Sequence, residues 1–112
     1  MKRIEILINP EKRDRLEEAI ENCNVSGVIF SHVVGYGNQK GRTTMFRGSE
    51  TKAHCLTKLR AETVVPDDKV EQLIEELVEE LQTGRIGDGK IFIHDVCDVV
   101  RIRTAERGDT AL

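Results

Sequence analysis

One pattern occurs twice in this sequence: a short apolar segment, then a proline, then apolar residues at helical spacing. Residues 3–9 (RIEILIN) alternate between apolar and polar side chains, as a strand with one buried face does, and Pro10 follows them directly. Residues 59–65 form a second strand-like segment, and Pro66 follows that one. Proline suits the first turn of a helix, where its missing N–H is not needed. Each half of the chain therefore predicts a strand that leads straight into a helix.

The helices that follow the two prolines differ in how clearly the sequence marks them. In the second half, aliphatic side chains recur every three or four residues and predict a helix over 70–81. The first helix has a shorter apolar stripe, and Asn9 stands where a helix cap would lie. The stripes consist of Leu16, Ala19, Ile20 and Cys23 in the first helix and Val70, Leu73, Ile74, Leu77, Val78 and Leu81 in the second.

Further strands complete a repeated β-α-β order. Segments rich in valine and isoleucine predict strands at 28–34, 90–94 and 99–103. A single domain over residues 1–112 with this order matches the ferredoxin-like βαββαβ sandwich, an α+β fold in which two helices cover one face of an antiparallel four-stranded sheet. Because two helices cannot cover both faces, we expect a homo-oligomer to cover the other.

Charge and composition exclude several classes of function. The chain has 112 residues and a formal net charge of −3, with the two signs well mixed, which argues against nucleic-acid binding. No apolar run approaches the roughly 18 residues of a membrane span, so we expect no membrane insertion. The N-terminus lacks a signal peptide, and three widely spaced cysteines are typical of a reducing compartment. We therefore expect a cytoplasmic protein.

A glycine-rich stretch after the second helix predicts a binding site for a polyphosphate. Three glycines precede Lys90, and glycine lets backbone N–H groups turn toward an anion. The spacing is that of a Walker A loop, but Ile91 stands where that loop needs Ser or Thr for Mg²⁺. The stretch also follows a helix and opens a strand, the reverse of the P-loop order. The glycines of this different phosphate loop are Gly84, Gly87 and Gly89.

Two arginines and a long loop extend this candidate site. Arg101 and Arg103 are two residues apart, so on a strand both guanidinium groups face one side and can grip one anion. Residues 35–57 contain four glycines and little periodicity, and so long a loop in a small domain is usually functional. Its glycine hinges would let it close over a ligand.

The chain has no arrangement of residues that is typical of catalysis. No Ser/His/Asp set, carboxylate pair or metal cage stands at a recognisable spacing, so we expect no catalytic residues and at most a slow incidental ATPase. The segments His54-Cys55 and His94-x-x-Cys97 have spacings that a metal could use. Neither gives the four-ligand pattern of a structural zinc site.

Five motifs stand in order along the chain: GYGNQKG at 35–41, RGSE at 47–50, VVPDDKVE at 64–71, TGRIGDGKIF at 83–92 and VVRIRTAERG at 99–108. Together they make the sequence resemble the PII signal-transduction proteins over nearly its whole length. The resemblance implies a trimer of ferredoxin-like subunits, with ATP and ADP competing for sites in the clefts between subunits. It also implies that 2-oxoglutarate is sensed with Mg-ATP, and that a long T-loop docks on a membrane transporter or metabolic enzyme.

The resemblance also implies which residues bind the nucleotide. The nucleotide loop would span 83–90, and the C-terminal segment 99–112 would supply two arginines that clamp phosphates from across a subunit boundary. Val64 would lie against the adenine, and Glu62 would pair with Lys40. The full nucleotide-binding set is Gly37, Gln39, Lys40, Glu62, Val64, Gly87, Asp88, Gly89, Lys90, Arg101 and Arg103.

The T-loop, about residues 37–55, would carry the effector and modification sites. By the same resemblance, Gln39 would help hold Mg²⁺ and 2-oxoglutarate, and Lys58 would reach the effector carboxylate. Ser49 matches a serine that is phosphorylated in some members. The family often carries a tyrosine that is nucleotidylated where this chain has Thr51, so we do not expect modification by that route.

Two further departures from the family pattern leave the function open. Ile29 replaces a threonine that often contacts adenine, and Asn38 replaces an arginine that often reaches the outer phosphate. One lost guanidinium contact costs about 1.5–3 kcal/mol, enough to tilt the ATP/ADP preference about tenfold or more. The first interpretation is a regulator of nitrogen and carbon metabolism. The second is a PII-like adenine-nucleotide sensor outside nitrogen control, which responds to another metabolite or metal and acts on a different transporter or enzyme.

Overall fold

The computed structural model describes residues 1–37, 43–46, 49–52 and 55–112, and for 43–46 and 49–52 it describes the backbone. The two helices are α1 (Arg13–Asn22) and α2 (Val70–Leu81). Each follows a 3₁₀ turn, η1 (Pro10–Lys12) or η2 (Asp67–Lys69), and a third such turn, η3 (Gly108–Ala111), ends the chain. The strands are β1 (Lys2–Ile8), β2 (Ile29–Tyr36), β3 (Thr43–Phe46), β4 (Ser49–Lys52), β5 (Cys55–Val65) and β6 (Lys90–Asp95).

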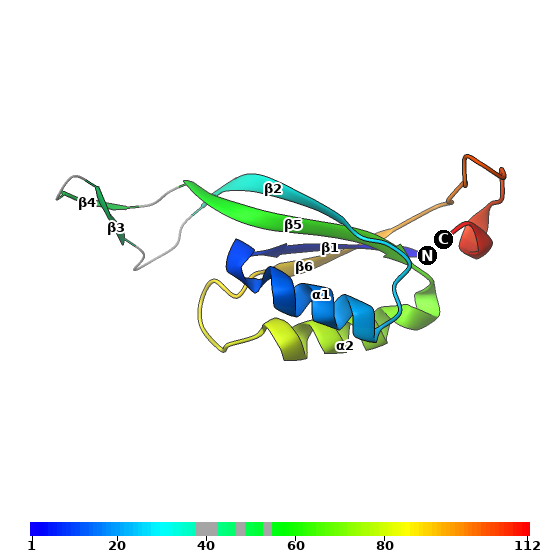
Figure 1. Ribbon diagram of the computed structural model, residues 1–112, viewed down its shortest axis with the longest axis horizontal. Helices are drawn as coiled ribbons and strands as arrows, with labels where there is room; N and C mark the ends of the chain where they lie inside the picture. The colour runs from blue at the N-terminus through cyan, green and yellow to red at the C-terminus, as the bar shows by residue number, and fades with distance from the viewer. Residues whose placement is uncertain (38–42, 47–48, 53–54) are drawn as a thin grey trace.

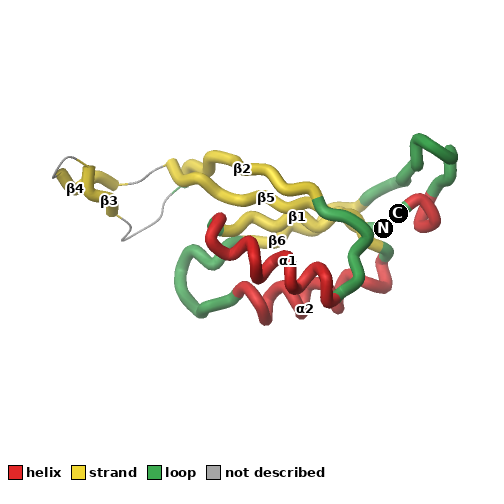
Figure 2. The backbone as a smooth tube through the Cα atoms, in the orientation of Figure 1, coloured by secondary structure: helices red, strands yellow, loops and turns green. Residues whose placement is uncertain are grey.

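Four of these strands form one antiparallel sheet in the order β2-β5-β1-β6. Both helices pack on the same face of this sheet, giving two layers (Figures 1 and 2). The two β-α-β halves interleave, because β1 lies between β5 and β6 while β5 lies between β2 and β1. This is the ferredoxin-like α+β arrangement that the sequence predicts.

The core lies between the helices and the helix-facing side of the sheet. In β1, Ile4, Ile6 and Ile8 point to that side and are almost completely buried. The register places Ile6 beside Ala61 of β5 and Ile91 of β6, so the alternation of each strand delivers its apolar side chains to one layer. The helices meet this layer with Leu16, Ala19 and Ile20 from α1 and Val70, Leu73, Leu77 and Leu81 from α2.

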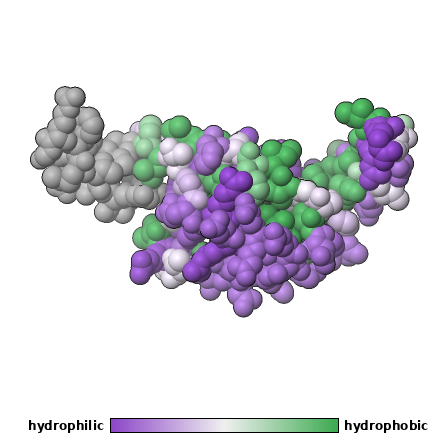
Figure 3. All heavy atoms as spheres, in the orientation of Figure 1, coloured by the Kyte–Doolittle hydropathy of each residue, from purple (hydrophilic) through white to green (hydrophobic). Residues whose placement is uncertain are grey.

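The face of the sheet that the helices leave open carries both charged and apolar side chains. Glu62 of β5 lies 3.7 Å from the Arg3 guanidinium and 3.9 Å from that of Arg60. The His94 ring lies 3.3 Å from the Glu5 carboxylate. The outer surface of the helix layer, in contrast, is hydrophilic (Figure 3). None of the helices that the structure describes is long and apolar enough to cross a membrane.

Most of the predicted elements are confirmed, with changes at their ends. The helix over 70–81 has the predicted bounds, and β1 shifts by one residue. The strand expected at 59–65 begins earlier, at Cys55, because it continues to pair with β2 as far as Tyr36. The long middle segment also contains the backbone of a separate two-stranded sheet, β3-β4, which the sequence did not predict.

The predicted strand at 99–103 is wrong. Val100 alone pairs, through an isolated bridge to Arg107, and the chain reverses between them. The Arg101 N–H donates to the Glu106 carbonyl at 2.9 Å, and the Ala105 N–H donates to the Arg101 carbonyl at 2.8 Å. Residues 99–103 therefore belong to a tight turn with its own local hydrogen bonds, and they do not add a strand to the sheet.

Candidate functional site

A cleft of about 510 Å³ lies at the end of the sheet where the loop from α2 enters β6. Strand β2 contributes its last two residues, Gly37 follows them, and β5 contributes Leu56 and Lys58. The loop contributes residues 85–89, and Lys90 is the first residue of β6. Of the predicted nucleotide and effector residues, the cleft brings together Gly37, Lys58, Gly87, Asp88, Gly89 and Lys90.

The glycines give this loop its shape. Gly84, Gly87 and Gly89 all have positive φ values, of +80°, +98° and +113°, which favour glycine. Gly89 is restricted a second time, because a Cβ on it would stand 2.3 Å from the Leu7 carbonyl oxygen. The loop therefore passes against the backbone of β1 where no side chain fits, and then enters β6 at Lys90.

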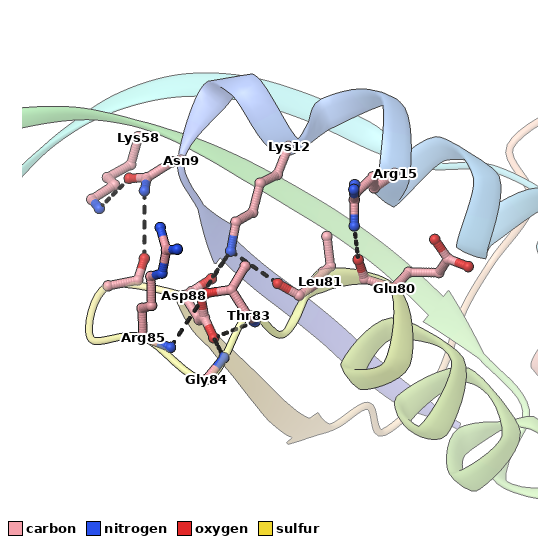
Figure 4. Close-up of polar contacts among 11 residues, drawn as sticks. Asn9, Lys12, Arg15, Lys58, Glu80, Leu81, Thr83, Gly84, Arg85 and Asp88 are labelled. Atoms are coloured by element: carbon pink, nitrogen blue, oxygen red, sulfur yellow. Dashed lines mark hydrogen bonds and ion pairs between the residues drawn. The ribbon is translucent and has the colours of Figure 1, made fainter.

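The carboxylate of Asp88 holds the loop from inside. It accepts hydrogen bonds from the Thr83 N–H at 2.7 Å and the Gly84 N–H at 3.1 Å, and from the Thr83 hydroxyl (Figure 4). These bonds from Thr83, with smaller contributions from Lys12 and Gly84, hold the pKa of Asp88 well below its usual range. Asp88 thus lies in the cleft as predicted, but its carboxylate fixes the loop.

Asn9 connects the loop to β5. The Lys58 ammonium donates a hydrogen bond to Asn9 Oδ1 at 2.6 Å, and Asn9 Nδ2 donates to the Gly87 carbonyl at 3.4 Å (Figure 4). Asn9 occupies the position before η1 that suggested a helix cap, yet its side chain makes no capping hydrogen bond. The cap prediction is therefore wrong, because the side chain bonds to Lys58 and Gly87 instead.

The charges that line the cleft suit a polyanion. Lys58, Arg85 and Lys90 bring three cationic side chains to one concave surface. The carboxylate of Asp88 is offset by the ammonium of Lys12 at 3.0 Å. Backbone N–H groups of a glycine-rich turn together with lysine and arginine are the usual partners of phosphate oxygens.

The other predicted binding residues lie away from this cleft within one subunit. Glu62 lies on the open face of the sheet with Arg3 and Arg60, whereas its expected partner Lys40 lies outside the described residues. Val64 lines a different cleft, of about 210 Å³, together with Leu112 near the C-terminus.

The segment that carries Arg101 and Arg103 also lies away from the phosphate loop. The chain leaves the cleft along β6, and the segment after it lies at the opposite end of the sheet (Figure 1). There the Arg101 guanidinium donates to Glu106 at 3.2 Å and to the carbonyls of Thr110 and Leu112. Arg103 is exposed. Because they lie in a turn, the two do not share one strand face as predicted.

Several predictions fall on residues that the structure does not describe. Gln39, the expected ligand of Mg²⁺ and 2-oxoglutarate, lies outside the described residues, and so does Asn38. Ser49 belongs to the backbone of β4, and its side chain is not described. Among residues with described positions, no group of three His, Cys, Asp or Glu side chains could hold a metal ion. His94 and Cys97 are among the described residues and belong to no such group.

Two residues that bond to the lining of the cleft were not predicted as part of the site: Asn9, which the sequence analysis considered only as a helix cap, and Lys12. Both belong to the turn between β1 and α1, and both reach the phosphate loop from the other half of the chain. Their spacing around Pro10 carries no recognisable motif. The one feature of the sequence that could have suggested them is their type: an amide side chain and a long cationic side chain stand close to the end of the predicted strand.

The fold is a ferredoxin-like α+β domain, and at one end of its sheet a glycine-rich loop and cationic side chains line a cleft. A family model described as "Nitrogen regulatory protein P-II" matches residues 1–106. The nitrogen regulatory protein P-II of Haemophilus influenzae and that of Pasteurella multocida are each 45% identical to the chain over 112 residues, the whole of both proteins. Nitrogen regulatory protein P-II 1 of Escherichia coli is 44% identical over the same length. The chain belongs to the P-II family of nitrogen regulatory proteins.

Proposed function

We propose that this chain is a regulatory subunit that binds ATP and ADP competitively and passes the ligand state to a target protein. The observation that carries the proposal is the cleft, in which a glycine-rich loop and three cationic side chains converge on one concave surface. Multiple charges on a polyphosphate favour such a surface, and bidentate guanidinium contacts add geometric selectivity.

We propose that a homotrimer completes the site. Within one subunit, the segment after β6, to which Arg101 and Arg103 belong, lies at the end of the sheet opposite the phosphate loop (Figure 1). A neighbouring subunit whose C-terminal end meets the cleft would supply these arginines, together with Glu62 and Val64. The open face of the sheet and the exposed Ile29 and Phe92 are further surface for contacts between subunits.

The effector would be 2-oxoglutarate, bound with Mg-ATP. Lys58 lines the cleft next to the phosphate loop, where its ammonium can meet both the nucleotide and a carboxylate. Gln39 would add a ligand for Mg²⁺, and Gln39 and Lys40 would line the phosphates from the T-loop of about residues 37–55. Because the T-loop starts and ends at the cleft, beside Gly37 and Leu56, ligand contacts would favour one of its conformations over the others.

The output would be docking of the T-loop on a membrane transporter or a metabolic enzyme of nitrogen and carbon metabolism in the cytoplasm. Phosphorylation of Ser49 would modify that docking surface. We propose no catalytic residues in this chain, since regulation by docking requires ligand binding alone.

An adenine-nucleotide sensor outside nitrogen control is the second candidate. The departures at Ile29 and Asn38 favour it, because both positions often contact the nucleotide in relatives. Ile29 is exposed on the edge strand β2, opposite Glu62 in the register. Such a sensor would bind ATP and ADP but would respond to an effector other than 2-oxoglutarate.

Competition calorimetry tests the proposal. ADP bound to the purified protein should be displaced by ATP, with one nucleotide site per subunit and a trimeric mass by sedimentation. Lys90→Gln should weaken both nucleotides, whereas Arg13→Gln, on an exposed helix turn, should weaken neither. A protein that binds neither nucleotide would contradict the proposed function.

A further inference from the structure

We infer that Lys12 is a positioning residue for nucleotide binding, because its ammonium fixes the phosphate loop and neutralises the carboxylate of Asp88 inside it. The inference rests on the proposed function. None of the five sequence motifs contains Lys12, which lies in the turn η1 before the first helix. It would act on the nucleotide through Asp88 rather than by direct contact.

The contacts of Lys12 join three parts of the fold (Figure 4). Its ammonium donates to the Asp88 carboxylate at 3.0 Å and to the carbonyl of Leu81, the last residue of α2, at 2.9 Å. A third, longer contact of 3.5 Å reaches the Asp88 carbonyl. The side chain is only 15% exposed. Lys12 therefore ties the start of α1 to the end of α2 and to the loop between α2 and β6.

The partner of Lys12 is the group that shapes the loop. The Asp88 carboxylate accepts the N–H groups of Thr83 and Gly84, so its position sets how the chain leaves α2. Asp88 also lines the cleft in which the phosphates would bind. Without Lys12, the negative charge of this carboxylate would no longer be compensated by a neighbouring cation. It would then repel the negative charges of a polyphosphate bound in the cleft.

This arrangement predicts a dependence on ligand charge. ATP carries more negative charge than ADP, and adenosine carries none. In Lys12→Met, a side chain of similar length without a charge, ATP should bind about tenfold more weakly or worse, ADP less so, and adenosine within about twofold of the wild type. A role limited to packing would weaken all three ligands alike.

Asp88→Asn in the Lys12→Met background separates charge from shape. The asparagine carbonyl can still accept the Thr83 and Gly84 N–H groups, but it carries no charge. The double variant should therefore recover part of the lost ATP affinity. Arg15→Met is the matched control: Arg15 of α1, like Lys12, donates to a carbonyl near the end of α2, that of Glu80, but the bond to the Asp88 carboxylate comes from Lys12.

Hydrogen exchange of the ligand-free protein tests the positioning without any nucleotide. The Thr83 and Gly84 amides should exchange faster in Lys12→Met than in the wild type or Arg15→Met. Unchanged exchange, or an equal loss of affinity for ATP and adenosine with no recovery in the double variant, would overturn the role of Lys12. Faster exchange in a protein whose wild type binds no ATP would uphold the loop-positioning role and contradict the proposed function instead.

Discussion

Asn9 and Lys58 are 49 residues apart in the chain, yet the Lys58 ammonium donates a hydrogen bond of 2.6 Å to the Asn9 side-chain oxygen. The amide nitrogen of Asn9 donates in turn to the Gly87 carbonyl. One small side chain thus connects the strand that carries the proposed effector residue to the proposed phosphate loop. Their positions are linked before any ligand binds.

Asn9→Ala removes both of these hydrogen bonds. We expect ATP to bind more weakly by about 1 kcal/mol, because each hydrogen bond of this kind contributes about 0.5–1.5 kcal/mol and the loop loses a support. Calorimetric titration with ATP measures the change. Asn22→Ala is the control, since it removes an exposed hydrogen bond between Asn22 and Glu76 on the helix layer. Equal affinities for the two variants would count against the link.

Gly89→Ala should destabilise the fold more than Gly84→Ala. Both positions have positive φ, which strains any other residue by about 1 kcal/mol or more. At Gly84 an added Cβ meets nothing within 4 Å, whereas at Gly89 it would stand 2.3 Å from the Leu7 carbonyl oxygen. Urea unfolding should therefore give a loss of about 1 kcal/mol for Gly84→Ala and at least about 2 kcal/mol for Gly89→Ala. Similar losses of unfolding free energy for the two variants would contradict the close contact between Gly89 and β1.

Asp88 should make the protein sensitive to acid. Its pKa in the folded state lies below the value of about 3.9 expected in the unfolded chain. The resulting stabilisation is complete above that unfolded value and is lost as the pH falls further and the carboxylate becomes protonated. Urea midpoints measured from pH 7 to pH 3 should fall less steeply below about pH 4 in Asp88→Asn than in the wild type. Parallel curves for Asp88→Asn and the wild type would refute this role.

Arg103→Ala tests the contribution of the C-terminal segment. If Arg103 clamps the phosphates from a neighbouring subunit, ATP affinity should fall by about 2 kcal/mol or more. The free energy of unfolding should hardly change, because the side chain is exposed within its own subunit. Arg13→Ala is the control for ATP affinity: this arginine of α1 lies outside the cleft, so its loss should leave ATP affinity unchanged. Unchanged ATP affinity would remove Arg103 from the proposed site.

The fold was predictable because its signals are local. Alternation in β1 and the three- and four-residue spacing in α2 each follow from the face that the element buries. The strand expected at 99–103 fails for the complementary reason: alternation requires a partner strand, and Val100 finds only Arg107. A pattern within one segment cannot reveal whether a neighbouring strand is available.

The site was predictable only in part. The glycines and Lys90 lie within seven consecutive residues, 84–90, so their spacing indicates a phosphate loop. Asn9 and Lys12 reach that loop across 78 and 76 positions of the chain. Nothing in the residues around Pro10 specifies such contacts, which depend on how β1 and β6 pair in the sheet.

The dependence of ATP binding on 2-oxoglutarate tests the central claim most directly. Calorimetric ATP titrations in the presence of Mg²⁺ should be run without 2-oxoglutarate and at several concentrations of it, on the wild type and on Lys58→Met. For the wild type, we predict that the Kd for ATP falls as 2-oxoglutarate rises, by a coupling free energy of about 1–3 kcal/mol, and that Lys58→Met abolishes the effect. An ATP affinity that stays the same at every 2-oxoglutarate concentration would contradict the account.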